Sequence, residues 1–207
     1  MKVSNGWLPG GVTLVLAALL GLASGISEAG DKKIKLKDPG GEERAVFILG
    51  SAKIKIKFVD EGRDFVLEGK RKGGKRKYSL DGDNPYIEVK PKEAGFKLRT
   101  PEGQLLWGVK LRDDKLEISD NEDGFQSFIV KKTRDTDRAK VSREDLDLGR
   151  VKFYAEKRVI KVKDVGGEER FRGRAAALSG AYGVLLMDDI PLPDRYIIMA
   201  ELFVLGW

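Results

Sequence analysis

The strongest local charge in this sequence lies at residues 70–77, which read KRKGGKRK. Its basic residues surround a Gly-Gly pair that is typical of a tight hairpin turn. They are Lys70, Arg71, Lys72, Lys75, Arg76 and Lys77. Directly opposed residues of two strands lie about 5 Å apart, so this density of like charge is repulsive unless an anionic partner relieves it. The run therefore indicates an anion-binding surface; the alternative is a solubilising hairpin tip whose lysines protect a strand edge.

The composition of the run narrows the expected partner. Basic runs of this kind often bind nucleic acid, but base stacking needs aromatic side chains and this run contains none. The chain is also expected to be exported, because its first residues resemble a signal peptide, and an exported protein meets little nucleic acid. We therefore expect an anionic lipid or an envelope polymer as the partner.

Catalytic and metal chemistry have few residues to build on. The chain contains no cysteine and no histidine, which excludes Cys/His zinc sites, a Ser-His-Asp triad and thiolate nucleophiles. The acidic turns at residues 81–84 and 120–124 offer oxygen ligands, but neither has the spacing of a calcium loop. We expect no cofactor, no metal and no enzyme activity. A hydrolase that uses a carboxylate pair, which needs two acids across a cleft, is a further alternative.

Glu201 is the other residue whose type and position could give it a chemical role. It is the only charge between Tyr196 and Leu205, so the helix expected here is apolar on every face and is predicted to be buried. A buried carboxylate must find a partner or take up a proton. Arg195 is six residues away and on another face of the helix. We expect either solvent near the helix end or an arginine from the surrounding wall; a gating or ligand role is the functional alternative.

The elements that position these residues are mostly strands. From Asp31 to about Phe171, apolar residues alternate with charged ones, as in Ile54, Ile56 and Phe58, and Gly-rich turns follow at close spacing. This pattern predicts a mainly β fold, an antiparallel meander of about a dozen strands closed into a barrel or folded as a sandwich; the apolar C-terminal helix, which strands would enclose, favours the barrel. The apolar segment 175–205 is expected to be helical and to lie inside the barrel or packed on it. Trp107 continues an alternation and is expected in the core.

The first residues have the layout of an export signal. Lys2 precedes an apolar stretch of 12 residues, Val12 to Ala23, and small residues follow at Ser27 and Ala29. Spanning a bilayer takes about 20 apolar residues, so a retained anchor is disfavoured. We expect residues 1–29 to be a signal peptide cleaved near Ala29, no transmembrane span after cleavage, and a single secreted or periplasmic domain over residues 30–207.

One segment occurs twice. Residues 34–44 read IKLKDPGGEER and residues 160–170 read IKVKDVGGEER. This predicts a strand, a glycine turn and a second strand used twice, near opposite ends of a closed sheet. The Glu-Glu-Arg clusters are expected to be solvated strand faces; two copies of a ligand site are the alternative.

The segment 96–124, FKLRTPEGQLLWGVKLRDDKLEISDNEDG, together with the apolar C-terminal helix, resembles the tubby-like superfamily, which includes LURP-one-related proteins and phospholipid scramblases. The resemblance is architectural and carries over no ligand residue. It implies a twelve-stranded barrel around a central hydrophobic helix, with membrane or phosphoinositide contact in some members. The export signal and the extra apolar segment before the last helix depart from that pattern.

Together these features predict an exported, non-enzymatic envelope or secreted protein that contacts an anionic surface through the hairpin at residues 70–77. The main alternative is a structural or protein-interaction module without a small ligand.

Overall fold

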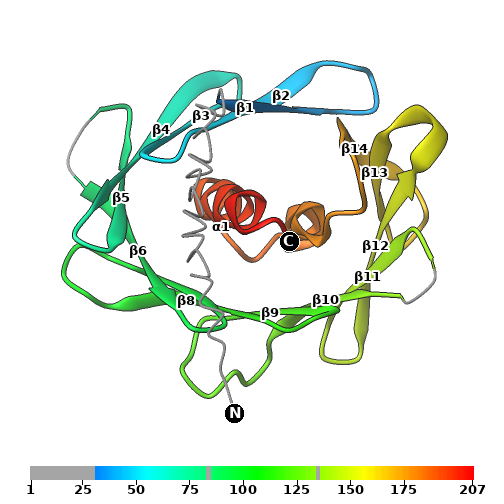
Figure 1. The fold of residues 1–207 in the computed structure, drawn as a ribbon. Helices are drawn as coiled ribbons and strands as arrows, with labels where there is room; N and C mark the ends of the chain where they lie inside the picture. The colour runs from blue at the N-terminus through cyan, green and yellow to red at the C-terminus, as the bar shows by residue number, and fades with distance from the viewer. Residues whose placement is uncertain (1–30, 83–84, 134–135) are drawn as a thin grey trace, which may run out of the picture.

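The computed structural model describes residues 31–82, 85–133 and 136–207, which form a closed antiparallel barrel of fourteen strands. Each strand pairs with the next along the chain, and the last closes on the first around a C-terminal helix (Figure 1). This confirms the fold class expected from the sequence, with fourteen strands where about a dozen were expected. The expected signal peptide lies outside the described residues.

The strands are short and follow one another without long connections. They are β1 (Lys32–Lys37), β2 (Glu43–Leu49), β3 (Lys53–Asp60), β4 (Arg63–Lys72), β5 (Lys75–Leu80), β6 (Pro85–Lys92), β7 (Gly95–Arg99), β8 (Leu105–Leu111), β9 (Lys115–Ser119), β10 (Phe128–Lys132), β11 (Arg138–Arg143), β12 (Leu146–Tyr154), β13 (Val159–Asp164) and β14 (Glu169–Arg174).

The residues that alternate in the sequence point in turn to the inside and the outside of the barrel wall. In β3, Ile54, Ile56 and Phe58 are buried, whereas Lys53 and Lys57 face solvent. The same pattern is weak in β14, whose inward positions are Phe171 and a glycine. Strands of this kind bury little apolar surface and leave little periodicity in the sequence, so their number is hard to predict.

The last helix, α1 (Leu192–Leu205), lies along the inside of the barrel. Strands cover one side of α1 and the preceding segment of the same chain covers another, so apolar residues are buried on both sides. Proline lies in its first turn, and Gly206 ends it in the left-handed conformation with φ 77°. None of the helices described is long and apolar enough to cross a membrane.

The segment before α1 is less helical than expected. Only the short 3-10 helix η2 (Gly180–Leu186) forms there, and residues 175–179 are irregular. Gly183 packs so closely on the wall that an added Cβ would lie 2.8 Å from the Val130 side chain. This crowding leaves no room for a regular α-helix carrying side chains on that face. The separate helix expected over residues 175–187 is therefore corrected to a short 3-10 helix, whereas the last helix expected from Asp194 to Leu205 is confirmed by α1.

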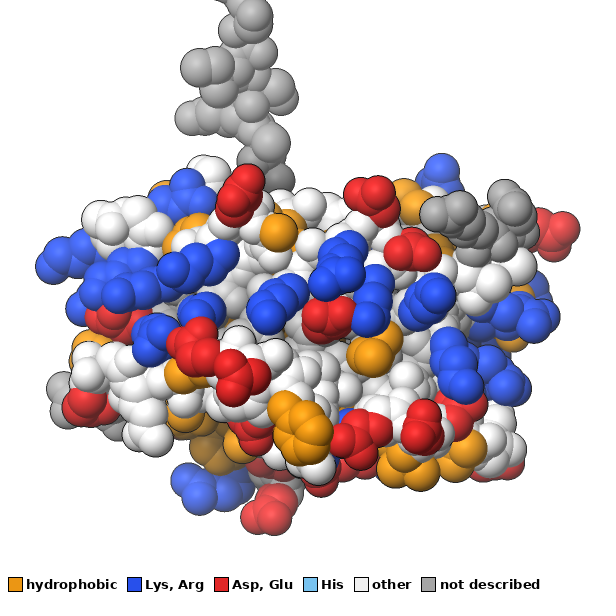
Figure 2. All heavy atoms as spheres, turned by 90° about the horizontal axis from the view of Figure 1, so that it is seen from below, with side chains coloured by type: hydrophobic (Ala, Val, Ile, Leu, Met, Phe, Trp, Pro, Cys, Tyr) orange, Lys and Arg blue, Asp and Glu red, His pale blue; other side chains and the backbone are white. Residues whose placement is uncertain are grey.

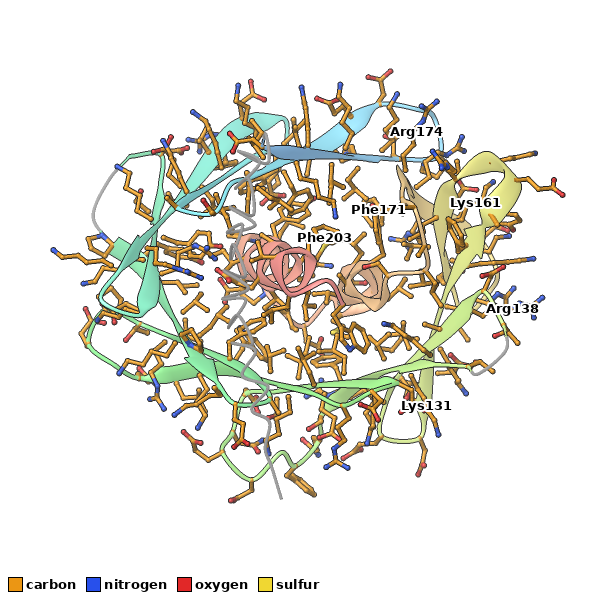
Figure 3. The ribbon with its side chains drawn as sticks, viewed as in Figure 1. Lys131, Arg138, Lys161, Phe171, Arg174 and Phe203 are labelled. Atoms are coloured by element: carbon orange, nitrogen blue, oxygen red, sulfur yellow. The ribbon has the colours of Figure 1, made fainter. Side chains whose placement is uncertain are left out.

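Aromatic rings fill the space between α1 and the wall. Phe47 on β2 meets Tyr196 and Phe203 of α1 edge to face, with ring centres 5.7 and 5.4 Å apart. Figure 3 shows Phe203 and Phe171 inside the wall and the charged side chains of Lys131 and Arg138 outside it. The interior is thus a packed core with the helix as its centre, as required when a barrel is filled by side chains.

The repeated segment forms the same hairpin twice. In the first copy, the Asp38 carboxylate accepts the Glu42 backbone N–H at 3.0 Å; in the second, Asp164 accepts that of Glu168 at 2.9 Å. One copy joins β1 to β2 and the other joins β13 to β14, so they flank the strands that close the barrel. They are therefore neighbours in space, because closure brings the two ends of the sheet together.

The closing seam between β1 and β14 is the narrowest pairing of the wall. Only Leu36 with Gly173 and Lys37 with Arg172 are paired there, whereas β3 and β4 are paired along eight positions. Beyond Arg174 the chain turns toward the interior, so the first residues of β1 have no strand beside them on this edge. The seam consequently opens toward the end of the barrel where α1 terminates.

Candidate functional site: the basic end of the barrel

The hairpin at residues 70–77 divides its charges between two faces of the wall. Lys70, Arg71 and Lys72 are exposed, and within the described residues none of them is in an ion pair. Lys75 and Lys77 both contact the Glu88 carboxylate of β6, at 2.5 and 2.7 Å. Their hydrogen bonds lower the pKa of Glu88 to about 2. Two of the six cations thus share a counter-charge within the fold.

Arg76 points into the barrel. It is 4% exposed, and its Nη1 lies 2.7 Å from both oxygens of Glu201 on α1. Burial lowers the pKa of Arg76, but Glu201 and Tyr78 together raise it more, so the guanidinium stays charged. This confirms one of the two alternatives expected for Glu201, an arginine from the wall. It also means that Arg76 is not available to a surface ligand.

Tyr78 completes the buried group. Its hydroxyl donates to Glu201 Oε1 at 2.7 Å, and burial, followed by the charge of Glu201, raises its pKa well above the usual value. Space for the ring comes from Gly69 on β4, where an added Cβ would lie 2.6 Å from the ring. Nε and Nη2 of Arg76 have no partner among the described residues. The group ties α1 to β5 in the middle of the core.

A second buried carboxylate lies near the start of α1. Asp194 accepts hydrogen bonds from Trp107 Nε1 at 2.9 Å and from the Tyr86 hydroxyl at 3.0 Å. Burial raises the pKa of Asp194 and outweighs the two hydrogen bonds, which lower it. Trp107 therefore packs against the core as expected and also fixes this carboxyl. Asp194 and Glu201 both have hydrogen-bond partners within the protein, and both face the interior of the barrel. A substrate at the surface would therefore not reach them.

The two ends of the barrel carry opposite charge. Because the strands form an antiparallel meander, successive turns alternate between the ends. The turns after β2, β4, β6, β8, β10 and β12 lie at the end where α1 terminates, here called the basic end. The other turns lie at the acidic end.

The basic end carries many cations without an ion pair among the described residues. They are Lys32, Lys33, Lys70, Arg71, Lys72, Lys90, Lys92, Arg112, Lys131, Lys132, Arg138, Lys157, Arg158 and Arg174. Acids such as Glu93 and Asp113 are the minority there. At the acidic end the reverse holds: Arg99 is paired with Glu122, and Arg143 with Asp189.

One side of the molecule makes this separation visible. On the face seen in Figure 2, lysine and arginine side chains form a band across the middle and upper part; most carboxylates lie below this band and a few lie along the upper rim. The C-terminal end of a helix carries partial negative charge, and α1 ends among the cations, which is the favourable orientation. The charge pattern is therefore a property of the whole end and not only of one hairpin.

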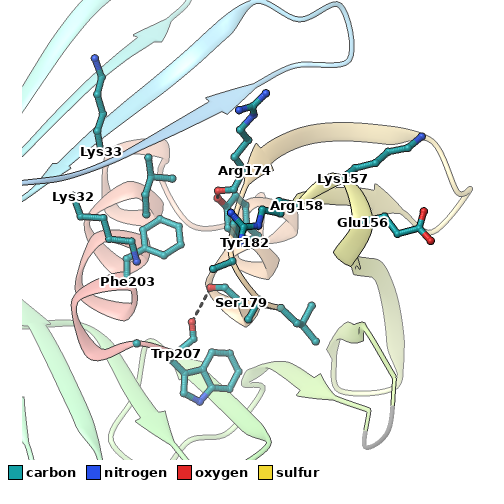
Figure 4. A pocket seen from close by; sticks show the side chains of 16 residues that line it. Lys32, Lys33, Glu156, Lys157, Arg158, Arg174, Ser179, Tyr182, Phe203 and Trp207 are labelled. Carbon is teal, nitrogen blue, oxygen red and sulfur yellow. Dashed lines mark hydrogen bonds between the residues drawn. The ribbon is translucent and has the colours of Figure 1, made fainter.

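A cavity of about 610 Å³ opens at the basic end beside the last turn of α1 (Figure 4). Its lining comes from the start of β1, the β12–β13 connection, the segment after β14 and the end of α1. Lys32 and Arg158 contribute charge, whereas Tyr182, Phe203 and Trp207 contribute aromatic surface. The Ser179 hydroxyl donates to the Trp207 carbonyl at 2.7 Å and holds the end of the chain against the lining.

Sequence reasoning found the hairpin but not this cavity. Its cations come from positions 32 and 158, which lie far apart in the sequence and come together only when the barrel closes. The signals present were the lysines of β1 and the Glu-Lys-Arg at 156–158, both of which read as ordinary strand and turn charges. The inward position of Arg76 did have a signal, because Arg76 and Tyr78 are two residues apart on one strand and share a face.

The acidic turns provide no metal site among the described residues. No group of three or more carboxylates is arranged to hold an ion in that part of the chain. Asp120 accepts a hydrogen bond from Asn121, and Asn121 Oδ1 accepts the Phe125 backbone N–H at 3.0 Å, as in an ordinary Asn-stabilised turn. Residues 83 and 84 of the other acidic turn lie outside the described residues.

Comparison with protein-family models, with curated proteins and with solved structures finds no match to this chain. The geometry and charge of the basic end are therefore the features from which a function is proposed.

Proposed function

We propose that this protein is an exported, non-enzymatic barrel that docks its basic end on an anionic lipid bilayer. The single observation that carries the proposal is the concentration, at one end of the barrel, of cations that have no ion pair within the described residues, with Lys70, Arg71 and Lys72 at its most charged turn. Each lysine or arginine near an anionic membrane surface contributes about 1 kcal/mol of attraction. Several of them acting together suffice for reversible binding.

Apolar residues at the same end favour a bilayer over a soluble anionic polymer. Val204 and Leu205, in the last turn of α1, are 41% and 54% exposed, and Trp207 is half-buried beside them. Lys132 lies over the Trp207 ring, 4.2 Å from its centre. Apolar and tryptophan side chains surrounded by cations suit the boundary between head groups and acyl chains. A polymer would gain nothing from contact with the two aliphatic side chains.

The proposal is tested by co-sedimentation with vesicles. Because the described barrel closes within residues 31–207, the chain from residue 30 is used. It should sediment with vesicles containing phosphatidylglycerol but not with pure phosphatidylcholine, and 0.5 M NaCl should abolish binding by screening. The variant K70E/R71E/K72E should bind at least tenfold more weakly.

A matched control separates local charge from net charge. The variant R44E/R63E/R170E makes the same change in net charge at the acidic end and should retain binding. Equal loss in both variants, or equal binding to neutral vesicles, would overturn the proposal. Binding to a soluble polyanion without sedimentation on vesicles would show that the partner is a polymer.

One observation favours the alternative of a protein-interaction module. Phe125, Leu146 and Val165 are 64–69% exposed and occupy neighbouring turns of the acidic end. Exposed apolar side chains grouped within a charged rim are typical of contact with another protein. In that case F125S/L146S should abolish the association measured by light scattering, while vesicle binding stays unchanged.

A further inference from the structure

We infer that the cavity beside the last turn of α1 binds a small amphipathic anion, a carboxylate or phosphate monoester that carries an aliphatic or aromatic body. Its volume of about 610 Å³ lies in the range of small-molecule sites, which is about 300–1,000 Å³. The inference goes beyond membrane docking, because it assigns a discrete ligand to one cavity.

The polar side of the cavity is almost entirely cationic. Lys32, Lys33, Lys157, Arg158 and Arg174 line it, and Glu156 is the only acid among its lining residues. Within the described residues none of the five cations is in an ion pair or donates a side-chain hydrogen bond. An anion is therefore the ligand charge that these groups leave uncompensated.

Two of the cations are aimed at the interior of the cavity. Figure 4 shows the Lys32 side chain running beside the Phe203 ring, with Arg158 facing it from the side of Tyr182. Lys33, Lys157 and Glu156 point away from the centre in the same view. An anionic group placed between Lys32 and Arg158 would thus contact charges from two opposite walls.

Arg158 is held there by an unusual backbone conformation. Its φ and ψ are 50° and 43°, in the left-handed region that a long side chain adopts at a cost. The Arg158 N–H donates to the Ala155 carbonyl at 3.1 Å, and the Ala175 N–H donates to the Arg158 carbonyl at 3.1 Å. These two hydrogen bonds fix the Arg158 backbone. Four other non-glycine turn residues of the described chain have a similar φ, so this conformation fixes the Arg158 backbone at the cavity without by itself marking a ligand site.

The remaining lining is apolar and gives the ligand its second property. Ile34, Tyr182 and Phe203 are buried at the cavity wall, and Leu178 and Trp207 are half-buried. A free inorganic phosphate would leave this surface in contact with water, whereas a short acyl chain or an aromatic ring would cover it. The cavity also adjoins a groove of about 470 Å³ along the β1–β14 seam, since Lys33, Ile34 and Arg174 line both. A longer tail could extend in that direction.

Calorimetric titration of the chain from residue 30 with four probes tests the inference. Octanoate and octyl phosphate should bind at least tenfold more tightly than octanol, which lacks the charge, and than inorganic phosphate, which lacks the tail. The variants K32Q and R158Q should each weaken octyl phosphate binding at least fivefold. The control K92Q, which removes an exposed unpaired cation elsewhere at the basic end, should change nothing.

The outcomes are separable from those of membrane docking. The variant K70E/R71E/K72E should bind octyl phosphate normally even though it loses vesicles. If octyl phosphate also displaces the protein from vesicles, the natural ligand is a lipid of the bilayer; if it does not, the ligand is a free amphiphile.

Equal binding of octanol and octanoate, equal binding of inorganic and octyl phosphate, or unchanged affinity in K32Q and R158Q would overturn the inference. A177W, which fills the cavity from an exposed position, should block binding in a protein that still folds.

Discussion

The ion pair between Arg76 and Glu201 is the residue-scale feature on which the position of α1 depends. Taking two charges out of water is costly, and their mutual attraction compensates for it only while both are present. Here the attraction is strengthened by the Tyr78 hydroxyl, and both side chains are buried. Together with the hydrogen bonds to Asp194 near the start of α1, the pair fixes the register of a helix whose other buried side chains are apolar.

Removing one partner should therefore cost more than removing both. E201L leaves a buried guanidinium without a counter-charge, and we expect the free energy of unfolding to fall by about 3–5 kcal/mol. R76M/E201L should recover much of that loss. Urea unfolding measures both, with D189N at the exposed Arg143–Asp189 pair as a control that should change stability by less than about 1 kcal/mol. A double variant less stable than E201L would contradict this account.

Glu88 makes a pH-dependent contribution whose sign follows from its lowered pKa. Hydrogen bonds from Lys75 and then Lys77 bring that pKa from 4.5 to about 2, so the folded protein holds the proton less readily than the unfolded chain. The resulting stability is present above pH 4.5 and is lost as the pH falls toward 2. Water screens the pairs, so we expect about 1–2 kcal/mol.

Urea unfolding of wild type and E88Q at several pH values measures this contribution. The stability difference between them should be largest near pH 6 and should shrink by pH 3. A difference that is constant over this range would mean that Glu88 acts only through packing. The lysines that it pairs are part of the basic hairpin, so E88Q should not weaken binding to anionic vesicles.

At the scale of elements, the seam between β1 and β14 should be the weakest part of the wall. Two residue pairs hold it, against eight between β3 and β4. Hydrogen exchange followed by mass spectrometry should show faster exchange in peptides covering β1 and β14 than in those covering β3 and β4. Octyl phosphate should slow the exchange at the seam if the cavity beside it is a ligand site. Uniform protection around the wall would contradict the seam argument.

The elements also show what the sequence could and could not predict. Period-two alternation and glycine turns were enough for the barrel, and the apolar run from Tyr196 to Leu205 was enough for α1. The duplicated Asp-x-Gly-Gly-Glu turn was recognisable from its repeated residues. In both copies the aspartate side chain accepts a hydrogen bond from the glutamate backbone N–H. The segment before α1 was not predictable as a 3-10 helix, because its tight coil is imposed by the close approach of Gly183 to Val130.

Contacts between distant elements were the part that stayed out of reach. The inward position of Arg76 follows from its spacing to Tyr78, but its pairing with Glu201 depends on which face of α1 meets β5. The cavity at the basic end likewise depends on closure, which brings Lys32 and Arg158 to the same opening. Sequence periodicity assigns a residue to a face but does not assign it a partner across the barrel.

At the scale of the whole molecule, the separation of charge orients the protein. A barrel with cations at one end and carboxylates at the other is attracted to an anionic surface end-on, and the acidic end is repelled. Val204 and Leu205 lie at the attracted end, where they reach the head groups only in that orientation. In the proposed docking, attachment and orientation therefore have the same physical cause.

Energy transfer to a labelled bilayer distinguishes end-on docking from every other orientation of the barrel. The chain has no native cysteine, so S51C at the basic end and Q104C at the acidic end each accept one donor dye without changing a charge. On phosphatidylglycerol vesicles carrying an acceptor on their head groups, transfer from position 51 should clearly exceed transfer from position 104. Equal transfer from the two positions, or stronger transfer from position 104, would contradict end-on docking through the basic end.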